Sequence, residues 1–368
     1  MASRTLFSLL TPVARNKGIG SLLLDTQLNT GRAPVTTLTA LADSITTTLD
    51  AASGTPASYT AIGFNILSNQ TLDLAAGNDF LTVSQGLAVN AIGLKIATGG
   101  TLNLGLGDDK VNILLTGTGS VGINNQSRFL AGAGSDLVRA DAILNGIVNG
   151  STTNVTAVFD TGAGADKVDA VSETGHAIVN YGTITLGLDN EADRDSITGG
   201  SAGHGALTPA YTPTKFGIFN AGTINFGGGK DVVDALVGGF GGDGTYNLGW
   251  TKTVAGVTTQ DQDVDVVNGF GAGTFNGGGG RNSITLPDGS YAITYTTKPL
   301  SLTDLASGKL TRNGDLTTVM TFNQFDGIGG SGVNGALHFV NAPPLGAVQT
   351  LSTFTVNALG DISALSYV

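Results

Sequence analysis

The residues whose type and spacing could support chemistry are aspartates in a recurring short phrase. The phrase has the form apolar-x-x-Gly-x-Gly-x-Asp-x-apolar, as in LNLGLGDDKV at 102–111. Its aspartates are Asp79, Asp109, Asp136, Asp166 and Asp231, with Asp195 in an expanded copy. Calcium accepts six to eight carboxylate and carbonyl oxygens in flexible geometry, so a column of such corners predicts calcium binding. An aspartate can instead hydrogen-bond its own turn while a neighbouring Lys or Arg supplies counter-charge, and the phrase leaves both interpretations open.

Two further acidic segments contain several carboxylates, which are candidate oxygen ligands for a cation. LDNEADRD at 188–195 places four acids at alternate positions, which predicts either a second cation site or a solvated loop. DQDVDVV at 261–267 predicts Asp261, Asp263 and Asp265 on one face of a strand. Calcium is the one cofactor predicted. The metal-ligand candidates taken from the phrase and from the first segment are Asp79, Asp109, Asp136, Asp166, Asp189, Glu191, Asp193, Asp195 and Asp231.

Residues suited to catalysis do not form a convincing set. GGSAG at 199–203 matches Gly-x-Ser-x-Gly and precedes His204, but a chain with 57 glycines produces such matches by chance. His176 and His338 have no metal-ligand spacing to His204. Trp250 with Tyr246 and Phe240 is compatible with a sugar-stacking surface, although packing of a loop is the commoner use of such residues. We therefore predict that the protein is not an enzyme.

The elements that position the aspartates follow from their spacing. Successive early aspartates are 27 to 30 residues apart, which is the length of a coil rather than of a hairpin. A second phrase, apolar-Asn-x-Gly-Thr-Ile at 178–184 and 218–224, marks strand, turn and strand, with Asn65, Asn180 and Asn220 as turn residues. One coil cannot bury its own apolar face, but coils stacked about 4.8 Å apart share a core. The fold class predicted is all-β, a parallel β-helix or β-solenoid of roughly 30-residue coils with a β-rich C-terminal cap.

The domain organisation predicted from the repeats has three parts. Residues 1–59 form an N-terminal extension and a possible subunit-joining segment, within which 36–52 has the spacing of a helix or of a strand pair. Residues 60–285 form the repeat solenoid, with insertions at 201–214 and 238–262 that leave the stack. Residues 286–368 alternate like antiparallel strands and form the cap, with a possible secretion signal.

Composition limits the classes of function. The chain has 368 residues, only 12% of them charged, and a net charge of −11, so no basic cluster is available for nucleic acid or for an anionic membrane. No apolar run is long enough for a membrane-spanning helix. There is no cysteine and hence no disulfide or thiolate site. The apolar patch near the N-terminus is too short for a cleaved secretory signal.

The Gly-x-Gly-x-Asp phrases resemble the nonapeptide of the hemolysin-type (RTX) calcium-binding repeat proteins of bacterial type I secretion. In that family the nonapeptides run in tandem, whereas here one half-site occurs about every 30 residues. The resemblance implies secretion without a cleaved N-terminal signal, a C-terminal address, and calcium at the aspartate corners. The segments GTINFGGGKDVVDA and GFGAGTFNGGGG are also similar to repeat-rich surface proteins common in cyanobacteria.

The function predicted from these features is that of an extracellular or cell-surface structural protein, which assembles with itself into a layer, sheath or filament and is stabilised by calcium. Cell-surface polysaccharide is a second candidate partner. A polysaccharide-acting β-helix enzyme and a carbohydrate-binding adhesin are the alternatives. The enzyme would need a groove lined with several acids and a base, and the adhesin would need exposed aromatic side chains, which are scarce in a chain that is 6% aromatic.

Overall fold

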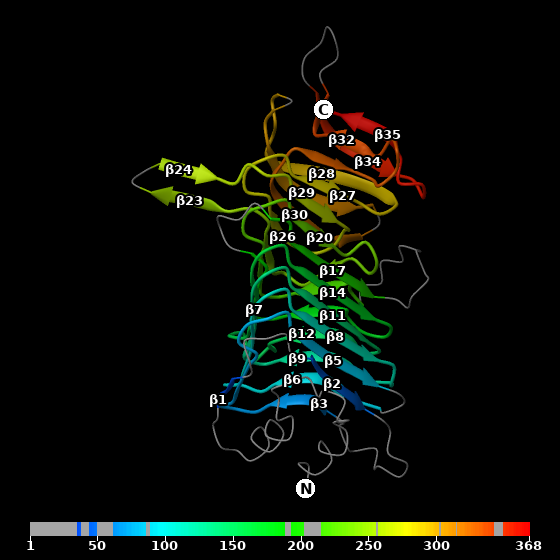
Figure 1. The fold of residues 1–368 in the computed structure, drawn as a ribbon. Coiled ribbons are helices and arrows are strands. Elements are labelled where there is room, and N and C mark those ends of the chain that lie inside the picture. Colours follow the sequence, from blue (N-terminus) through cyan, green and yellow to red (C-terminus); the bar gives the residue numbers. More distant parts are fainter. Residues whose placement is uncertain are drawn as a thin grey trace.

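The computed structural model is an elongated stack of β-strands (Figure 1). It describes residues 35–37, 44–49, 62–85, 89–187, 193–201, 215–254, 257–301, 303–313, 315–341 and 349–368. Every regular element within these ranges is a β-strand, and most strands pair in parallel with the coils before and after their own. The predicted all-β class and the β-solenoid architecture are therefore confirmed.

Each coil contributes up to three strands, one to each of three parallel sheets. The solenoid strands of the first sheet are β1 (Val35–Thr37), β4 (Thr71–Asp73), β7 (Thr101–Leu106), β10 (Arg128–Ala133), β13 (Val158–Ala163), β16 (Thr183–Thr185), β19 (Thr223–Asn225), β22 (Thr245–Asn247), β26 (Gly273–Asn276) and β30 (Asp315–Phe325).

The second sheet follows the aspartate corners. It consists of β2 (Ser44–Leu49), β5 (Phe80–Gln85), β8 (Lys110–Leu115), β11 (Leu137–Ala142), β14 (Lys167–Ser172), β17 (Ser196–Ser201), β20 (Val232–Asp234), β25 (Val266–Asn268), β27 (Ser283–Thr285), β31 (Gly327–Gly329) and the antiparallel β32 (Ala336–His338). The third sheet consists of β3 (Ile62–Ile66), β6 (Ile92–Ile96), β9 (Val121–Asn125), β12 (Asn145–Asn149), β15 (Ile178–Asn180), β18 (Ile218–Asn220) and β21 (Phe240–Gly241).

The core lies inside the coils, where equivalent apolar residues stack from coil to coil. Phe129 pairs in register with Phe159, and their rings stack at a centroid distance of 4.2 Å. Tyr246 and Phe275 repeat this arrangement further along at 4.4 Å. All four side chains are fully buried. Burial of an aromatic side chain is worth a few kcal/mol, and stacking adds about 1 kcal/mol, so these columns hold the coils together.

Glycine at the corners is required by close contact between coils. Gly132 has φ of 120°, and a Cβ placed there would lie 1.7 Å from the carbonyl oxygen of Gly105 in the preceding coil. Gly162 has φ of 96° and the same relation to Gly132. Only glycine combines this backbone conformation with the absence of a side chain, which explains the two glycines in most copies of the phrase. The copy at 72–81 has Ala75 at the first of these positions, with φ of 72°.

The parallel stack extends past the predicted domain boundaries at both ends. Towards the N-terminus, β1 pairs with β4 and β2 with β5, so the helix-or-strand segment at 36–52 contains two solenoid strands. Towards the C-terminus, β30 pairs in parallel with β26, and β31 with β27. These coils lack the Gly-x-Gly-x-Asp phrase, and strand pairing alone identifies them. The predicted loop at 238–262 likewise contains β21 and β22 of the stack.

The C-terminal region forms an antiparallel cap at one end of the stack (Figure 1). Its strands are β28 (Gly289–Thr297), β29 (Ala306–Arg312), β33 (Val340–Asn341), β34 (Gln349–Val356) and β35 (Ile362–Tyr367), and it includes β30. A separate hairpin, β23 (Thr251–Val254) with β24 (Val257–Gln260), projects sideways from the stack. The other predicted insertion, at 201–214, lies outside the described residues except for Ser201.

Candidate functional site

The repeat aspartates form one column along the inside of the solenoid. Each stands one residue before a strand of the second sheet, so the parallel register of that sheet places them above one another. The column contains Asp79, Asp109, Asp136, Asp166, Asp195, Asp231, Asp265 and finally Asn282. We call this column the aspartate ladder.

A hydrogen bond of the same kind joins every step of the aspartate ladder. The backbone N–H of Asp109 donates to Oδ1 of Asp136 at 2.8 Å, and the N–H of Asp136 donates to Oδ1 of Asp166 at 2.8 Å. The bond distances over all seven steps lie between 2.7 and 3.0 Å. Each carboxyl therefore satisfies a backbone donor of the preceding coil rather than of its own turn, which corrects the local turn-capping interpretation.

The second carboxyl oxygen of the ladder is buried without a hydrogen-bond partner. This holds for Oδ2 of Asp109, Asp136, Asp166, Asp231 and Asp265, whose side chains are at most 2% exposed. Burial of an ionised carboxylate without a full set of donors costs several kcal/mol, and such a group shifts its pKa instead.

Burial raises the pKa of these carboxyls. Loss of solvation is the largest cause in each case, and the backbone N–H bond opposes it without cancelling it. The pKa is raised to about 6 at Asp109, about 7 at Asp136, about 8 at Asp166, about 9 at Asp231 and about 7 at Asp265. Burial thus raises the pKa of these five ladder carboxyls above the usual aspartate range.

The other predicted metal ligands do not gather into a cluster in the described part of the chain. Asp193 is exposed while Asp195 is a buried member of the ladder, and Asp189 and Glu191 lie outside the described residues. Among the residues that the structure describes, no three His, Asp or Glu side chains are placed to share a metal ion. The ladder offers one carboxyl per coil, and calcium at these positions stays a prediction.

The third acidic segment does not form a strand. Residues 261–265 are a turn, in which Asp263 donates its N–H to Oδ1 of Asp261 at 2.8 Å, and only Asp265 joins the ladder. Burial raises the pKa of Asp261 as well. The predicted strand over Asp261, Asp263 and Asp265 is therefore wrong, because β25 begins only at Val266. The three acids still lie near one another, since the charges of Asp261 and Asp263 help to raise the pKa of Asp265.

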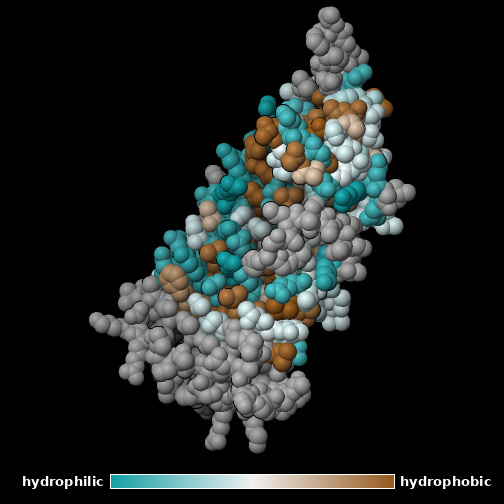
Figure 2. Space-filling view, turned by 90° about the vertical axis from the view of Figure 1, so that its right-hand side faces the viewer, coloured by the Kyte–Doolittle hydropathy of each residue, from teal (hydrophilic) through white to brown (hydrophobic). Residues whose placement is uncertain are grey.

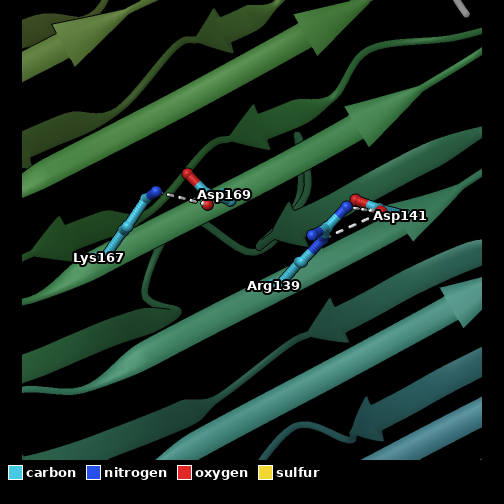
Figure 3. A network of polar contacts seen from close by, with 4 residues as sticks. All are labelled: Arg139, Asp141, Lys167 and Asp169. Atoms are coloured by element: carbon cyan, nitrogen blue, oxygen red, sulfur yellow. Dashed lines mark hydrogen bonds and ion pairs between the residues drawn. The ribbon is translucent and has the colours of Figure 1, made fainter. Parts of the chain in front are cut away.

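The basic residues beside the phrase pair on the outside of the solenoid. Figure 3 shows Arg139 bonded to Asp141 on β11 and Lys167 bonded to Asp169 on β14, at 2.7 and 3.0 Å. Lys110 lies over the ring of Phe80, 5.5 Å from its centroid. Arg139, Lys110 and Lys167 thus have outer-face partners, and the predicted counter-charge from these residues to the repeat acids is not what the structure shows.

A second polar column occupies the corner between the third and first sheets. Asn125, Asn149, Asn180 and Asn220 are fully buried, and each Nδ2 of the first three donates to Oδ1 of the next at 2.8 to 2.9 Å. All four Nδ2 groups also donate to a backbone carbonyl, such as Thr183 O for Asn149. The repeated apolar-Asn phrase indicated Asn180 and Asn220 as turn residues, but did not reveal the ladder.

The residues considered for catalysis or sugar binding have structural partners. Ser201 is buried and donates its hydroxyl to Gly175 O at 2.7 Å, and His204 lies outside the described residues. His176 accepts the N–H of Phe216 on Nδ1 at 3.0 Å. Phe240 and Tyr246 are in the core, so the proposed aromatic surface with Trp250 does not form.

The ladder supplies buried carboxyl groups in one column along the inside of the solenoid. No helix in the described part of the chain is long and apolar enough to cross a membrane. Comparison of the chain with family models, curated proteins and solved structures gives no match.

Proposed function

We propose that the protein is an extracellular structural protein whose solenoid is a stiff rod that joins to further copies of itself at its first coil. The observation that carries this proposal is the difference between the two ends of the rod. One end is closed by the antiparallel cap, and the other begins with parallel strands.

The first coil supplies the edges for joining. Within the described residues, β1, β2 and β3 pair only with β4, β5 and β6 of the following coil, and each is the last strand of its sheet at that end. An open strand edge carries unpaired N–H and C=O groups and is a template for another strand. Three such edges at one end favour attachment of a second copy there.

The rest of the rod is suited to a structural role. Its outer face carries ion pairs and half-buried polar side chains, and Figure 2 shows hydrophilic and hydrophobic residues interspersed over the described side. On the first sheet, Asn225, Asn247, Asn276 and Asn323 form an outer ladder with amide hydrogen bonds of 2.7 to 2.8 Å. Such repeated bonds stiffen the stack along its axis because every coil is tied to the next.

The experiment is sedimentation velocity and negative-stain electron microscopy of the full chain over a range of concentrations. We expect end-to-end oligomers. In this proposal Met1–Arg32 adds a strand to the open edges of the first coil of a neighbouring copy, so a variant that lacks Met1–Arg32 should remain monomeric. The matched control replaces the hairpin Thr251–Gln260 by a short glycine linker and should assemble like the full chain. A monomer at every concentration, or unchanged assembly of the shortened variant, would refute this mode of joining.

The location is tested by fractionation of the source cells. We expect the protein in the medium or on the cell surface, and its retention inside intact cells would contradict an extracellular role. Loss of rod assembly together with depolymerisation of an added polysaccharide would instead favour the enzyme alternative.

A further inference from the structure

The outer face of the first sheet repeats nearly the same pair of side chains over five consecutive coils. The strands concerned are β16, β19, β22, β26 and β30, which pair in parallel without a shift of register. The middle residues of the pairing, such as Ile224 and Tyr246, are fully buried, so the residues on either side of them face outwards. The first outward column consists of Thr183, Thr223, Thr245, Thr274 and Thr321.

The second outward column is fixed by its own hydrogen bonds. It consists of Thr185, Asn225, Asn247, Asn276 and Asn323. Each Nδ2 of the last three donates to Oδ1 of the preceding asparagine, at 2.7 to 2.8 Å. The threonines of the first column are β-branched and have few rotamers. The two columns, which we call the Thr–Asn array, therefore form a surface that is ordered before any partner arrives.

The threonines of the first column have hydroxyl groups that the protein itself does not use. All five side chains are half-buried among their neighbours on the sheet. Within the described part of the chain, none of their hydroxyls takes part in a side-chain hydrogen bond. A hydroxyl is both a donor and an acceptor. The array thus presents one hydroxyl per coil, at a repeating position, to whatever lies outside the sheet.

The array is uncharged although the chain has a net charge of −11. Charged side chains stand only at its two ends, where Asp160 pairs with Thr185 and Lys309 pairs with Thr321. The outer face of the second sheet differs, because it carries the ion pairs of Arg139 and Lys167. A surface of neutral donors and acceptors is complementary to a neutral partner and offers nothing to an ionic one.

The size and composition of the array argue against two neutral partners. A stable interface between two copies uses about 20–30 residues a side, whereas the array has two residues in each of five coils. Polysaccharide surfaces are bound by exposed aromatic rings. The aromatic residues of these strands, Tyr246, Phe275 and Phe322, are fully buried in the core.

The spacing of the array is regular in two directions. Strands of a sheet lie about 4.8 Å apart, and alternate residues of one parallel strand are about 6.6 Å apart. Inside the same coils, the rings of Tyr246 and Phe275 stack at 4.4 Å. Water molecules in the crystal planes of ice repeat over distances of this size. Hydroxyl and amide groups can take the place of such molecules, because ordered water bonds to them nearly as well as they bond to each other.

We infer that the Thr–Asn array is a binding face for ice, in which the free threonine hydroxyls and the fixed asparagine amides replace water molecules at the surface of a crystal. A protein held on that surface by many weak bonds at once blocks the addition of further water beneath it. This activity is separate from the joining of copies at the first coil, and neither requires the other.

The direct test places a fusion of the full chain with green fluorescent protein in a solution that holds one slowly growing ice crystal. We expect fluorescence to collect on the crystal, whereas the fluorescent protein alone should be excluded from it. We also expect the full chain without the fusion to hold the freezing point of a crystal below its melting point, as measured by nanolitre osmometry. Exclusion of the fusion from ice, with no gap between freezing and melting, would overturn the inference.

Substitutions test whether the array is the binding face. Thr245 lies on the middle strand, so Thr245→Lys places a long charged side chain at the centre of the array. We expect this variant to lose most of the adsorption and of the freezing gap while its thermal unfolding stays close to that of the wild type. The matched control is Thr198→Lys, since Thr198 is a half-buried threonine on the outer face of the second sheet. An equal loss in both variants would contradict the assignment.

A milder variant keeps the test valid if Thr245→Lys does not fold. Thr245→Val preserves the shape of the side chain and removes only the hydroxyl, so it should fold and show a smaller freezing gap. An unchanged gap would contradict the role of the hydroxyls. Two further results would overturn the inference in favour of another partner, provided that ice adsorption is absent: side-by-side dimers that Thr245→Val or Thr245→Lys separates in sedimentation, or retention of the full chain on crystalline cellulose or chitin.

Discussion

Asp265 donates its backbone N–H to Oδ1 of Asn282 at 2.9 Å, and Asp231 donates in the same way to Oδ1 of Asp265 at 3.0 Å. Aspartate and asparagine are therefore equivalent on the accepting side of the ladder. They differ at the second atom, which is a donor in Asn282 and an oxygen without a donor in Asp265. At this last position the amide therefore satisfies two turn carbonyls, which an ionised carboxylate could not do.

Exchange of the terminal amide for an acid should create a pH-sensitive step. In Asn282→Asp, a carboxylate at pH 8 would face Gly277 O and Gly279 O, and we expect a loss of about 1–3 kcal/mol in the free energy of unfolding. At pH 4 the neutral acid can donate one of the two lost bonds, so most of the loss should disappear. Urea denaturation at both pH values measures this, with the exposed Asn112→Asp as the control. An equal loss at pH 4 and pH 8 would show that the proton is irrelevant.

The buried column of Asn125, Asn149, Asn180 and Asn220 should lose more stability when one of its asparagines is replaced by aspartate. Asn180 uses Nδ2 to bond Asn220 Oδ1 at 2.8 Å and Thr223 O at 3.1 Å, and it accepts on Oδ1 from Asn149 at 2.9 Å. Asn180→Asp leaves two buried acceptors without a donor and places a charge among them. We expect a loss on the order of 3–5 kcal/mol at pH 7. The measurement is thermal melting of Asn180→Asp and of Asp166→Asn under the same conditions. Equal melting temperatures of the two variants would contradict the prediction.

Close approach of the coils should make the corner glycines irreplaceable. Gly132→Ala introduces a Cβ within 1.7 Å of Gly105 O at a φ of 120°, so the two coils must separate. We expect a loss of roughly 3 kcal/mol or more in the free energy of unfolding. Gly200→Ala is the matched control, because nothing lies within 4 Å of the new Cβ. Denaturant unfolding of both variants tests the prediction, which fails if they are equally stable.

The outer ion pair of Lys167 with Asp169 should contribute little to stability. Lys167 bonds Asp169 at 3.0 Å, and the exposed fractions of the two side chains are 54% and 27%, so solvent screens the pair. Lys167→Met should change the free energy of unfolding by less than about 1 kcal/mol. The pair of Arg139 with Asp141 on β11 is not equivalent, because the side chain of Asp141 is only 9% exposed. A much larger loss in denaturant unfolding, accompanied by a change in the aspartate titration, would mean that Lys167 neutralises the ladder after all.

The repeat phrase was sufficient to predict the solenoid and its approximate coil length, and the alternation of residues in 286–368 predicted the antiparallel strands of the cap. The ends of the stack could not be predicted, since β1, β2 and β31 carry no phrase and are recognised only by the strands with which they pair. The places of Phe240 and Tyr246 were also missed, because a long insertion that follows short strands resembles a surface loop. Asn125 and Asn149 lie in less regular copies of the asparagine phrase, so their ladder was not apparent.

The sequence by itself determined that this chain stacks coils, because glycines at fixed offsets and apolar residues in alternation recur with the period of a coil. It also placed an aspartate at the same corner of most coils. Only the tertiary structure decided that these aspartates point inwards and that each carboxyl accepts a hydrogen bond from the preceding coil. The direction of a corner side chain depends on the register between coils about 30 residues apart. That burial, rather than the phrase, turns a row of potential calcium ligands into a row of acids with raised pKa values.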